Sequence, residues 1–366
     1  MARLEFGAVD PPVSHWGRPA RVFRAIRHVA GGPKGGTMDA QKEAPMRILL
    51  ATDGSAPADR ARDLVAAMPW PRGTFIRVVS VVSKGADVSA PWSPETANLP
   101  DVDRFADPAV RTHALALDAA ERDLAIAHPD TVVDRFLLRG RAASAIVEEA
   151  RQFRADLIVV GHRGHGPIET MLLGSVSAEI VDHAPCAVLV ARGAELGPIV
   201  LADDGSASGN TAAGVLEALP LPAQLPITVL SVSDTGLPYA TAAAPGLYDR
   251  AIESYVRSRA DARAETQEIA DAAATRLRLA GYRATAVVHD GDPAHEIVEY
   301  AKDHGTGLLV LGTRGNTGLK RLLLGSVARN VLLHAPCSVL IVRETVVPPV
   351  PEREATLVSS GRGPSI

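Results

Sequence analysis

Short apolar runs alternate with longer amphipathic segments over most of this chain. The first run, Arg47–Ala51, stops at Thr52–Ser55, a Thr-Asp-Gly-Ser sequence typical of a buried strand that enters a turn. Helical composition follows at 56–68, and a β-branched run at 74–82 predicts the next strand. The alternation continues with helices at 109–128, 142–154 and about 175–183, and with strands at 131–138, 156–160 and 187–191. This order predicts an α/β fold, a parallel sheet with helices on both faces.

The whole pattern is then repeated at a constant offset of 151 residues. Ile199–Ser206 matches Ile48–Ser55. The same offset relates further pairs, which are Ser80 and Ser231, Gly140 and Gly291, Gly161 and Gly312, Gly174 and Gly325, and Pro185 and Pro336. We therefore predict two copies of one domain, at 46–192 and 197–343, joined by a short link.

The two ends of the chain differ from the repeated part. Residues 1–45 are rich in Arg, Gly and Pro, and we expect a disordered extension or a translated leader ahead of Met38 or Met46. A second interpretation is a basic amphipathic helix at Arg18–His28 that touches a membrane or a partner. The Pro-containing tail at 344–366 is also expected to be disordered.

Composition and charge restrict the partners. A net charge of −4 gives no general attraction to nucleic acid or to an anionic membrane. No apolar run reaches the roughly 18–20 residues that span a bilayer, and the first 30 residues lack a signal-peptide pattern. We therefore expect a cytoplasmic protein. Its two cysteines follow His-Ala-Pro in apolar runs, where a buried, reduced thiol is expected.

A glycine motif follows the fourth strand of each copy. In the first copy it is Gly161-His162-Arg163-Gly164, then nine residues, then Gly174-Ser175. Glycine lets the backbone approach a ligand closely, and the free N–H groups of a following helix attract anions. The motif therefore predicts a phosphate cradle in each copy, although glycines that only form turns remain an alternative. It is not a Walker A loop, because no Lys follows the later glycine.

Charge and shape for such a cradle must come from neighbouring side chains. Arg163 and Arg314 are placed to contact phosphate. Asp53 and Asp204 end the first strand of each copy, where a carboxylate can accept hydrogen bonds from a ribose or can simply form a turn. Val81 and Val232 end the second strands and either pack on a base or belong to the core.

The sequence contains no catalytic constellation. His162 and His165 occur only in the first copy, because Thr313 and Asn316 take their places in the second. His183 and His334 do repeat, but at a predicted helix end, where a histidine more often hydrogen-bonds carbonyls than performs chemistry. We therefore expect binding rather than efficient turnover.

The motif also resembles that of the universal stress protein family: a strand, Gly-x-x-Gly, nine residues, Gly-Ser, a helix and His-Ala-Pro-Cys. The resemblance covers about 46–343 and implies two Rossmann-like domains, similar to adenine nucleotide α-hydrolases. Each would have a five-stranded parallel sheet, and the domains would pair through their fifth strands, here within one chain. One departure is Gly140-Arg141-Ala142, where the second copy has the family's Gly-Asp-Pro at 291–293.

The resemblance further implies an ATP site, with or without Mg²⁺, in each copy. Carried over by position, the first site consists of Asp53, Val81, Val160, Gly161, Arg163, Gly164, Gly174, Ser175 and Val176. The second consists of Asp204, Val232, Leu311, Gly312, Arg314, Gly315, Gly325, Ser326 and Val327.

The function expected from these features is a nucleotide-responsive binding module in stress adaptation, with an adenine nucleotide as its ligand. Intramolecular pairing of the two domains is expected, and a homodimer is a further option. Two alternatives stay open. One is a slow ATPase or nucleotidyl-transfer enzyme, and the other is a ligand-free interaction protein.

Overall fold

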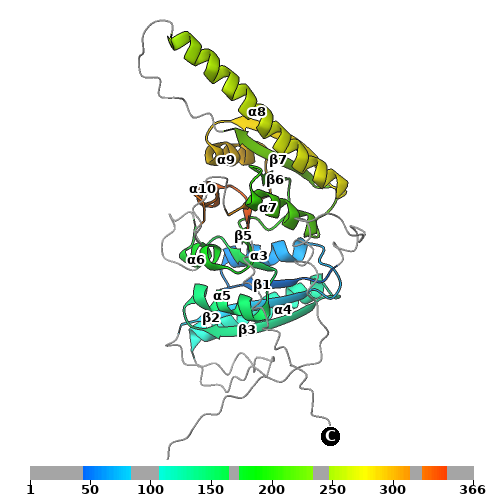
Figure 1. Cartoon of the computed structure of the whole chain (residues 1–366). Helices are drawn as coiled ribbons and strands as arrows, with labels where there is room; N and C mark the ends of the chain where they lie inside the picture. The colour runs from blue at the N-terminus through cyan, green and yellow to red at the C-terminus, as the bar shows by residue number, and fades with distance from the viewer. Residues whose placement is uncertain (1–43, 84–106, 165–172, 234–246, 314–323, 344–366) are drawn as a thin grey trace, which may run out of the picture.

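The apolar runs of the first half form the strands of a parallel sheet, and the segments between them form its helices (Figure 1). The computed structural model describes residues 44–83, 107–164, 173–233, 247–313 and 324–343. The first half contains β1 (Arg47–Ala51), α3 (Ala56–Ala67), β2 (Phe75–Val82), α4 (Pro108–Ala127), β3 (Val132–Arg139), α5 (Ala142–Phe153), β4 (Leu157–Gly161), α6 (Ser175–His183) and β5 (Ala187–Ala191). Each observed element begins and ends within one residue of the segment that periodicity predicted.

The second half repeats this order. It contains β6 (Ile199–Ala202), α7 (Ala207–Ala218), β7 (Pro226–Ser233), α8 (Leu247–Leu279), β8 (Arg283–Asp290), α9 (Pro293–Asp303), β9 (Leu308–Gly312), α10 (Ser326–His334) and β10 (Ser338–Val342). The clearest difference between the halves is α8, which has 33 residues where its counterpart α4 has 20. In Figure 1, the first turns of α8 extend beyond the rest of the second half.

All ten strands belong to one sheet, in the order β3-β2-β1-β4-β5-β10-β9-β6-β7-β8. Pairing is parallel within each half, and the two halves meet where β5 runs antiparallel to β10, with Leu189 opposite Leu340. The fold class predicted from the sequence is confirmed, and the expected pairing of the fifth strands is seen within the chain.

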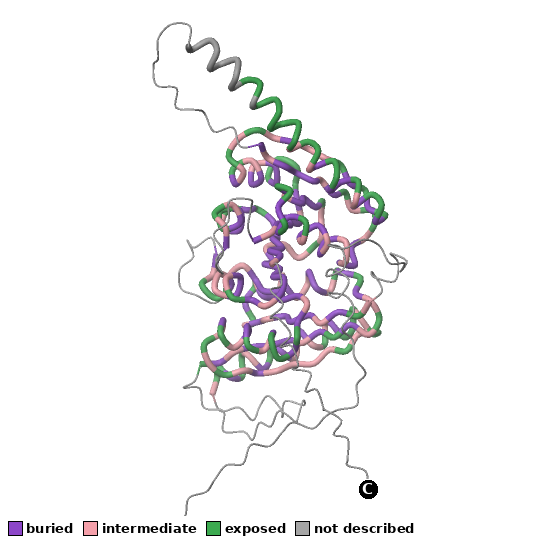
Figure 2. The backbone as a smooth tube through the Cα atoms, in the orientation of Figure 1, coloured by how far each residue is buried: buried purple, intermediate pink, exposed green. Residues whose placement is uncertain are grey.

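Two hydrophobic cores cover the two faces of this sheet, and each core runs through both halves. Buried residues of α3, α4, α7 and α8 form one, and buried residues of α5, α6, α9 and α10 form the other. Figure 2 shows the buried strands along the middle of the molecule and the exposed outer surface of α8. The apolar runs are continuous rather than alternating because both faces of the strands are covered.

The halves are also joined by two arginines in equivalent positions. Arg192, directly after β5, donates from Nη2 to the carbonyl of Leu332 in α10, over 2.6 Å. Its counterpart Arg343, directly after β10, donates from Nε to the carbonyl of Val181 in α6, over 3.1 Å. Each half thus supplies a cation to the last turn of a helix in the other half, α10 or α6. The helix dipole and the unpaired carbonyls favour positive charge there.

The junction between the first and fourth strand of each half is built in two different ways. In the first half, the backbone N–H of Arg47 donates to the Asp156 carboxylate over 2.8 Å. In the second half, Pro198 takes the place of Arg47 and has no N–H, and Gly307 takes the place of Asp156. Gly307 instead packs directly on Gly197, and it keeps the backbone hydrogen bond to the Pro198 carbonyl, over 2.8 Å, that Asp156 makes to the Arg47 carbonyl in the first half.

Asp156 makes the stability of the first half dependent on pH. Burial raises the pKa of its carboxyl to about 6, although the N–H and the charge of Arg47 oppose the shift. The folded state therefore holds this proton more tightly than the unfolded chain, and stability falls as pH rises from about 4 to about 6. Asp156→Asn should remove that loss, so the variant's gain over wild type should grow by about 2 kcal/mol across this window. Urea unfolding at pH 4.5 and pH 7 measures the gain, and an equal difference at both pH values would contradict the assignment.

Several predictions from the sequence fall on parts of the chain that the structure leaves undescribed. Nearly all of the expected extension at 1–45, the expected disordered tail at 344–366 and most of the expected loop at 83–107 lie outside the described residues. Among the helices that are described, none is both long enough and apolar enough to cross a membrane.

Candidate functional site

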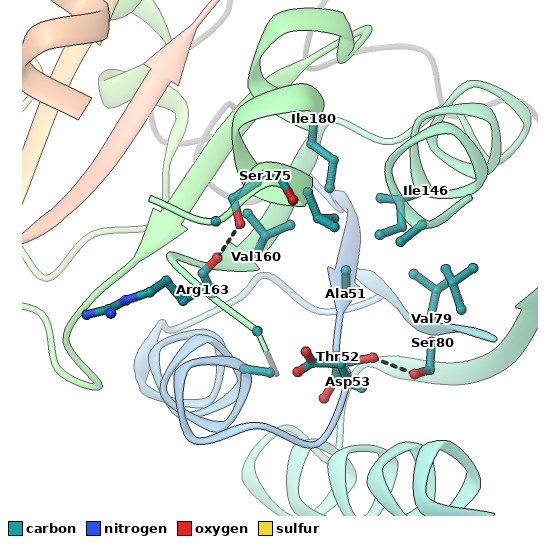
Figure 3. A pocket seen from close by; sticks show the side chains of 18 residues that line it. Ala51, Thr52, Asp53, Val79, Ser80, Ile146, Val160, Arg163, Ser175 and Ile180 are labelled. Atoms are coloured by element: carbon teal, nitrogen blue, oxygen red, sulfur yellow. Dashed lines mark hydrogen bonds between the residues drawn. The ribbon is translucent and has the colours of Figure 1, made fainter. Parts of the chain in front are cut away.

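A cavity of about 380 Å³ opens at the carboxyl ends of β1, β2 and β4 in the first half (Figure 3). All nine residues proposed for the first site line it, together with Ala51, Thr52, Ala58, Val79, Ser80, Ala142, Ile146, Ser177 and Ile180. Its volume lies within the range of small-molecule sites. The position agrees with the general rule that ligands of open α/β sheets bind beyond the carboxyl ends of the strands.

The turn after β1 holds Asp53 at the rim of this cavity. Gly54 adopts φ +77°, and Asp53 Oδ1 accepts a hydrogen bond from the Ser55 N–H over 3.0 Å. Ser55 in turn caps α3 by accepting from the Ala58 N–H. The Asp-Gly-Ser sequence therefore forms a turn, as one interpretation expected, and the same turn presents a carboxylate to the cavity.

The first turn of α6 forms the opposite wall. Gly174 is its N-cap and provides no side-chain hydrogen bond, in contrast to the serine that caps α3. Ser175, Val176 and Ser177 line the cavity. The first N–H groups of a helix have no intrahelical acceptor, and here no capping side chain accepts from them, so they form a ready anion-binding surface.

The glycines of the motif have different structural roles. A Cβ on Gly161 would lie 2.7 Å from the backbone of Pro57 in α3, so this glycine lets α3 pack closely on β4. A Cβ on Gly164 would lie 2.3 Å from Asp53 Oδ2, so Gly164 leaves room for the carboxylate. Close packing of strand and helix and close approach within the cavity therefore both depend on glycine.

Arg163 has a less direct relation to the cavity than the sequence suggested. Its residue lines the cavity, but Figure 3 shows the side chain directed away from Asp53 and Ser175. Burial lowers the pKa of both His162 and Arg192, and the positive charge of Arg163 lowers each of them further, so the guanidinium interacts with these basic groups.

Sequence reasoning missed several cavity residues. Ser80 donates to the Thr52 carbonyl over 2.5 Å and lies 2.7 Å from His113 Nδ1, so it fixes the end of β2 against β1. A signal was present, since Ser231 recurs at the same offset and donates to the Asp203 carbonyl over 2.6 Å. Ala142 and Ile146 come from α5, and no local motif marks them.

The second half repeats most of the backbone arrangement that surrounds the cavity in the first half. Asp204 accepts from the Ser206 N–H over 3.1 Å, and Gly325 is an N-cap without a side-chain bond. The N–H of Gly325 donates to the Thr313 carbonyl over 2.8 Å, as Gly174 does to His162. Leu311 is buried, Val232 and Val327 pack on the core, Gly312 ends β9 and Ser326 begins α10. Arg314 and Gly315 lie outside the described residues.

One substitution makes the second half chemically different. Asp203 stands where the first half has the cavity-lining Thr52, and burial raises the pKa of its carboxyl. A Cβ on Gly209 would lie 2.2 Å from Asp203 Oδ1, whereas the first half has Ala58 at that position. The larger Asp203 side chain and the smaller residue 209 therefore compensate for each other.

Two other expectations are confirmed. His183 and His334 use Nδ1 to hydrogen-bond the carbonyls of Glu179 and Asn330, each over 2.9 Å, within their helices. Both cysteines are free and buried. Burial raises the pKa of the Cys337 thiol to about 11 and raises that of Cys186 further, so neither is an activated nucleophile.

The fold and the cavity define a class of protein with two tandem Rossmann-like domains in one sheet. Residues 45–192 and 195–343 each match the model of the universal stress protein family. The matches cover more than half of the chain, so this protein belongs to the universal stress protein family, as a tandem member.

Individual relatives agree with this assignment. A universal stress protein of Mycobacterium tuberculosis is 28% identical over 312 residues, which cover 81% of this chain and 97% of that protein. A universal stress protein of Thermus aquaticus is 37% identical over 145 residues, which cover 40% of this chain and 97% of the relative. The crystal structure of a universal stress protein from Archaeoglobus fulgidus superposes with a TM-score of 0.52 at 16% identity, covering 81% of this chain and 98% of that one. That likeness concerns the fold.

Proposed function

We propose that this protein binds ATP in the cavity of the first half and acts as a nucleotide-responsive binding module in stress adaptation. The observation that carries the proposal is the uncapped N-terminus of α6, which lines a cavity together with Asp53. The N-terminal N–H groups suit phosphate, and the Asp53 carboxylate suits a ribose hydroxyl. Val81, Val160 and Ile146 provide an apolar wall for a base.

The cavity is better suited to binding than to catalysis. Among the described residues of its lining, Asp53 and Arg163 are the charged ones, and no second carboxylate or histidine joins them there. Among the described residues, no group of three or more His, Cys, Asp or Glu side chains could hold a metal ion. Phosphoryl transfer depends on positioned charge around the transferred group. The slow ATPase or nucleotidyl-transfer alternative would gain support from phosphate release that is lost in Gly174→Val and Gly325→Val.

The second half is proposed as the weaker site. Asp203 adds a carboxylate at the position of a cavity-lining residue, and a negative charge near phosphate opposes nucleotide binding. The shared Asp-Gly-Ser turn and the uncapped α10 N-terminus support binding there as well.

Heating the purified protein with and without Mg-ATP tests the proposal. Ligand at 100 times Kd should add about 2.7 kcal/mol of stability and raise the unfolding midpoint by several degrees. Magnesium chloride at equal ionic strength is the control and should leave the midpoint unchanged. Mass spectrometry of small molecules released from the freshly purified, denatured protein should identify an adenine nucleotide. An unchanged midpoint at millimolar Mg-ATP would refute nucleotide binding and leave the ligand-free interaction protein.

A further inference from the structure

Four basic side chains gather where β4 and β5 end. Gly161 and Ala191 are register partners in these strands, so His162 and Arg192 follow at the same end of the sheet. The His162 N–H donates to the Ala191 carbonyl over 3.0 Å. Arg60 lies about one turn along α3 from Pro57, whose backbone Gly161 faces closely. Arg163 is the next residue after His162.

The electrostatics show that these groups lie within range of one another. The pKa of His162 falls to about 4, first because of burial and then because of the positive charges of Arg192, Arg163 and Arg60. The charge of Arg163 also lowers the pKa of Arg192, after the larger effect of burial. Among the residues that the structure describes, the charged groups that act on the imidazole are all positive, so this part of the cluster has an excess of positive charge.

Three atoms of the cluster are buried without a hydrogen-bond partner in the part of the chain that the structure describes. They are Arg60 Nε, His162 Nδ1 and Arg192 Nη1. The other terminal nitrogen of Arg192 is already used by Leu332. A buried polar atom without a partner costs free energy, and native structures rarely leave several together. Three such atoms beside an excess of positive charge indicate that an anionic group belongs there.

We propose that Arg60, His162 and Arg192, together with Arg163, form an anion-binding subsite for a phosphate-type oxyanion, beside the cavity of the first half. Guanidinium groups match the geometry of phosphate oxygens, and a neutral imidazole can donate a further hydrogen bond. The oxyanion is either free inorganic phosphate or the terminal phosphate of a nucleotide in the cavity. The second source rests on the proposed function, and the first is independent of it.

The subsite belongs to the first half alone. At the positions of Arg60 and His162, the second half has Thr211 and Thr313. These threonines occupy the same places in α7 and after β9. The second half therefore provides a matched design, because Arg60→Thr combined with His162→Thr introduces residues that this fold already accepts.

Isothermal titration with inorganic phosphate, AMP and ATP tests the subsite in wild type, in the Arg60→Thr/His162→Thr variant and in Arg72→Ala. Arg72 is an exposed arginine of the same half, paired with Asp130, and its replacement controls for loss of positive charge. In the double variant, we expect either the affinity for phosphate or the ratio of ATP to AMP affinity to fall at least tenfold. In Arg72→Ala, both quantities should equal those of wild type. If the double variant does not fold, Arg60→Thr alone replaces it.

The three ligands distinguish free phosphate from the terminal phosphate of a nucleotide, and they test the subsite separately from the proposed nucleotide binding. Weakened binding of phosphate alone identifies the free anion, even if no nucleotide binds. A lower ATP to AMP ratio without phosphate binding identifies the terminal phosphate. Nucleotide binding with an unchanged ratio and no phosphate binding overturns the subsite but leaves the proposed function intact. An equal loss in Arg72→Ala also overturns it.

Discussion

Replacing Gly164 with valine should lower the ATP affinity of the first half by about ten- to a hundredfold while the protein stays folded. The new Cβ would lie 2.3 Å from Asp53 Oδ2, so the carboxylate must leave its present position. A hydrogen bond to a charged group contributes roughly 1.5–3 kcal/mol, and 1.4 kcal/mol corresponds to tenfold in affinity. Gly164 is exposed, so the change should affect the cavity rather than the core.

Titration with Mg-ATP measures this effect, and Gly315→Val is the matched variant in the second half. The second half is expected to bind ATP more weakly because it carries the additional carboxylate of Asp203. Gly164→Val should therefore cause the larger loss of ATP affinity. Circular dichroism and the unfolding midpoint without ligand establish that each variant is folded. If both valine variants bind ATP as wild type does, the glycine motif is not part of a nucleotide site.

Replacing Gly307 with alanine should destabilise the second half by about 3 kcal/mol, at the upper end of overpacking effects. A Cβ at this position would lie 2.3 Å from the backbone nitrogen and 2.5 Å from the Cα of Gly197. Both atoms belong to the backbone, so no side-chain rotation can relieve the contact. The hydrogen bond from Gly307 to Pro198 would have to break or lengthen.

Gly193→Ala provides the control for this prediction. A Cβ on Gly193 would have its nearest neighbour at 3.9 Å, an ordinary contact, and the residue lies in the same connecting region. Urea unfolding should show a lower midpoint for Gly307→Ala and a nearly unchanged midpoint for Gly193→Ala. Equal midpoints for the two variants would show that the strand junction can move apart at little cost.

The order of elements was predictable from the sequence because both faces of the sheet are covered. Continuous runs such as Leu157–Val160 then stand out from the amphipathic helices around them. The repeated glycine motif and the strand ends pointed to most of the proposed cavity residues of the first half, whereas Val160 and Val176 came only from the resemblance to the universal stress protein family. Asp53, Gly164 and Gly174 are examples that a local motif was enough to find.

Features that join distant segments could not be predicted in this way. Arg192 donates to Leu332 across 140 residues, and no local pattern distinguishes it from a solvated arginine. Asp156 of the first half is replaced by Gly307 in the second half. This difference goes with Pro198, which lacks the N–H that Arg47 donates to Asp156. The direction of the Arg163 side chain depends on its rotamer rather than on the motif.

The antiparallel contact of β5 with β10 has a further consequence, for how the two halves can evolve. In a symmetric homodimer every substitution is expressed on both sides of the interface. Here a substitution changes one side only: Arg329 pairs with Asp182 over 2.9 Å, whereas the equivalent positions hold Ala178 and Leu333. Covalent linkage thus allows the duplicated halves to diverge in chemistry while the common sheet is preserved. The basic cluster in the first half and Asp203 in the second are two such differences between the halves, and the expected stoichiometry is one anion subsite for each chain.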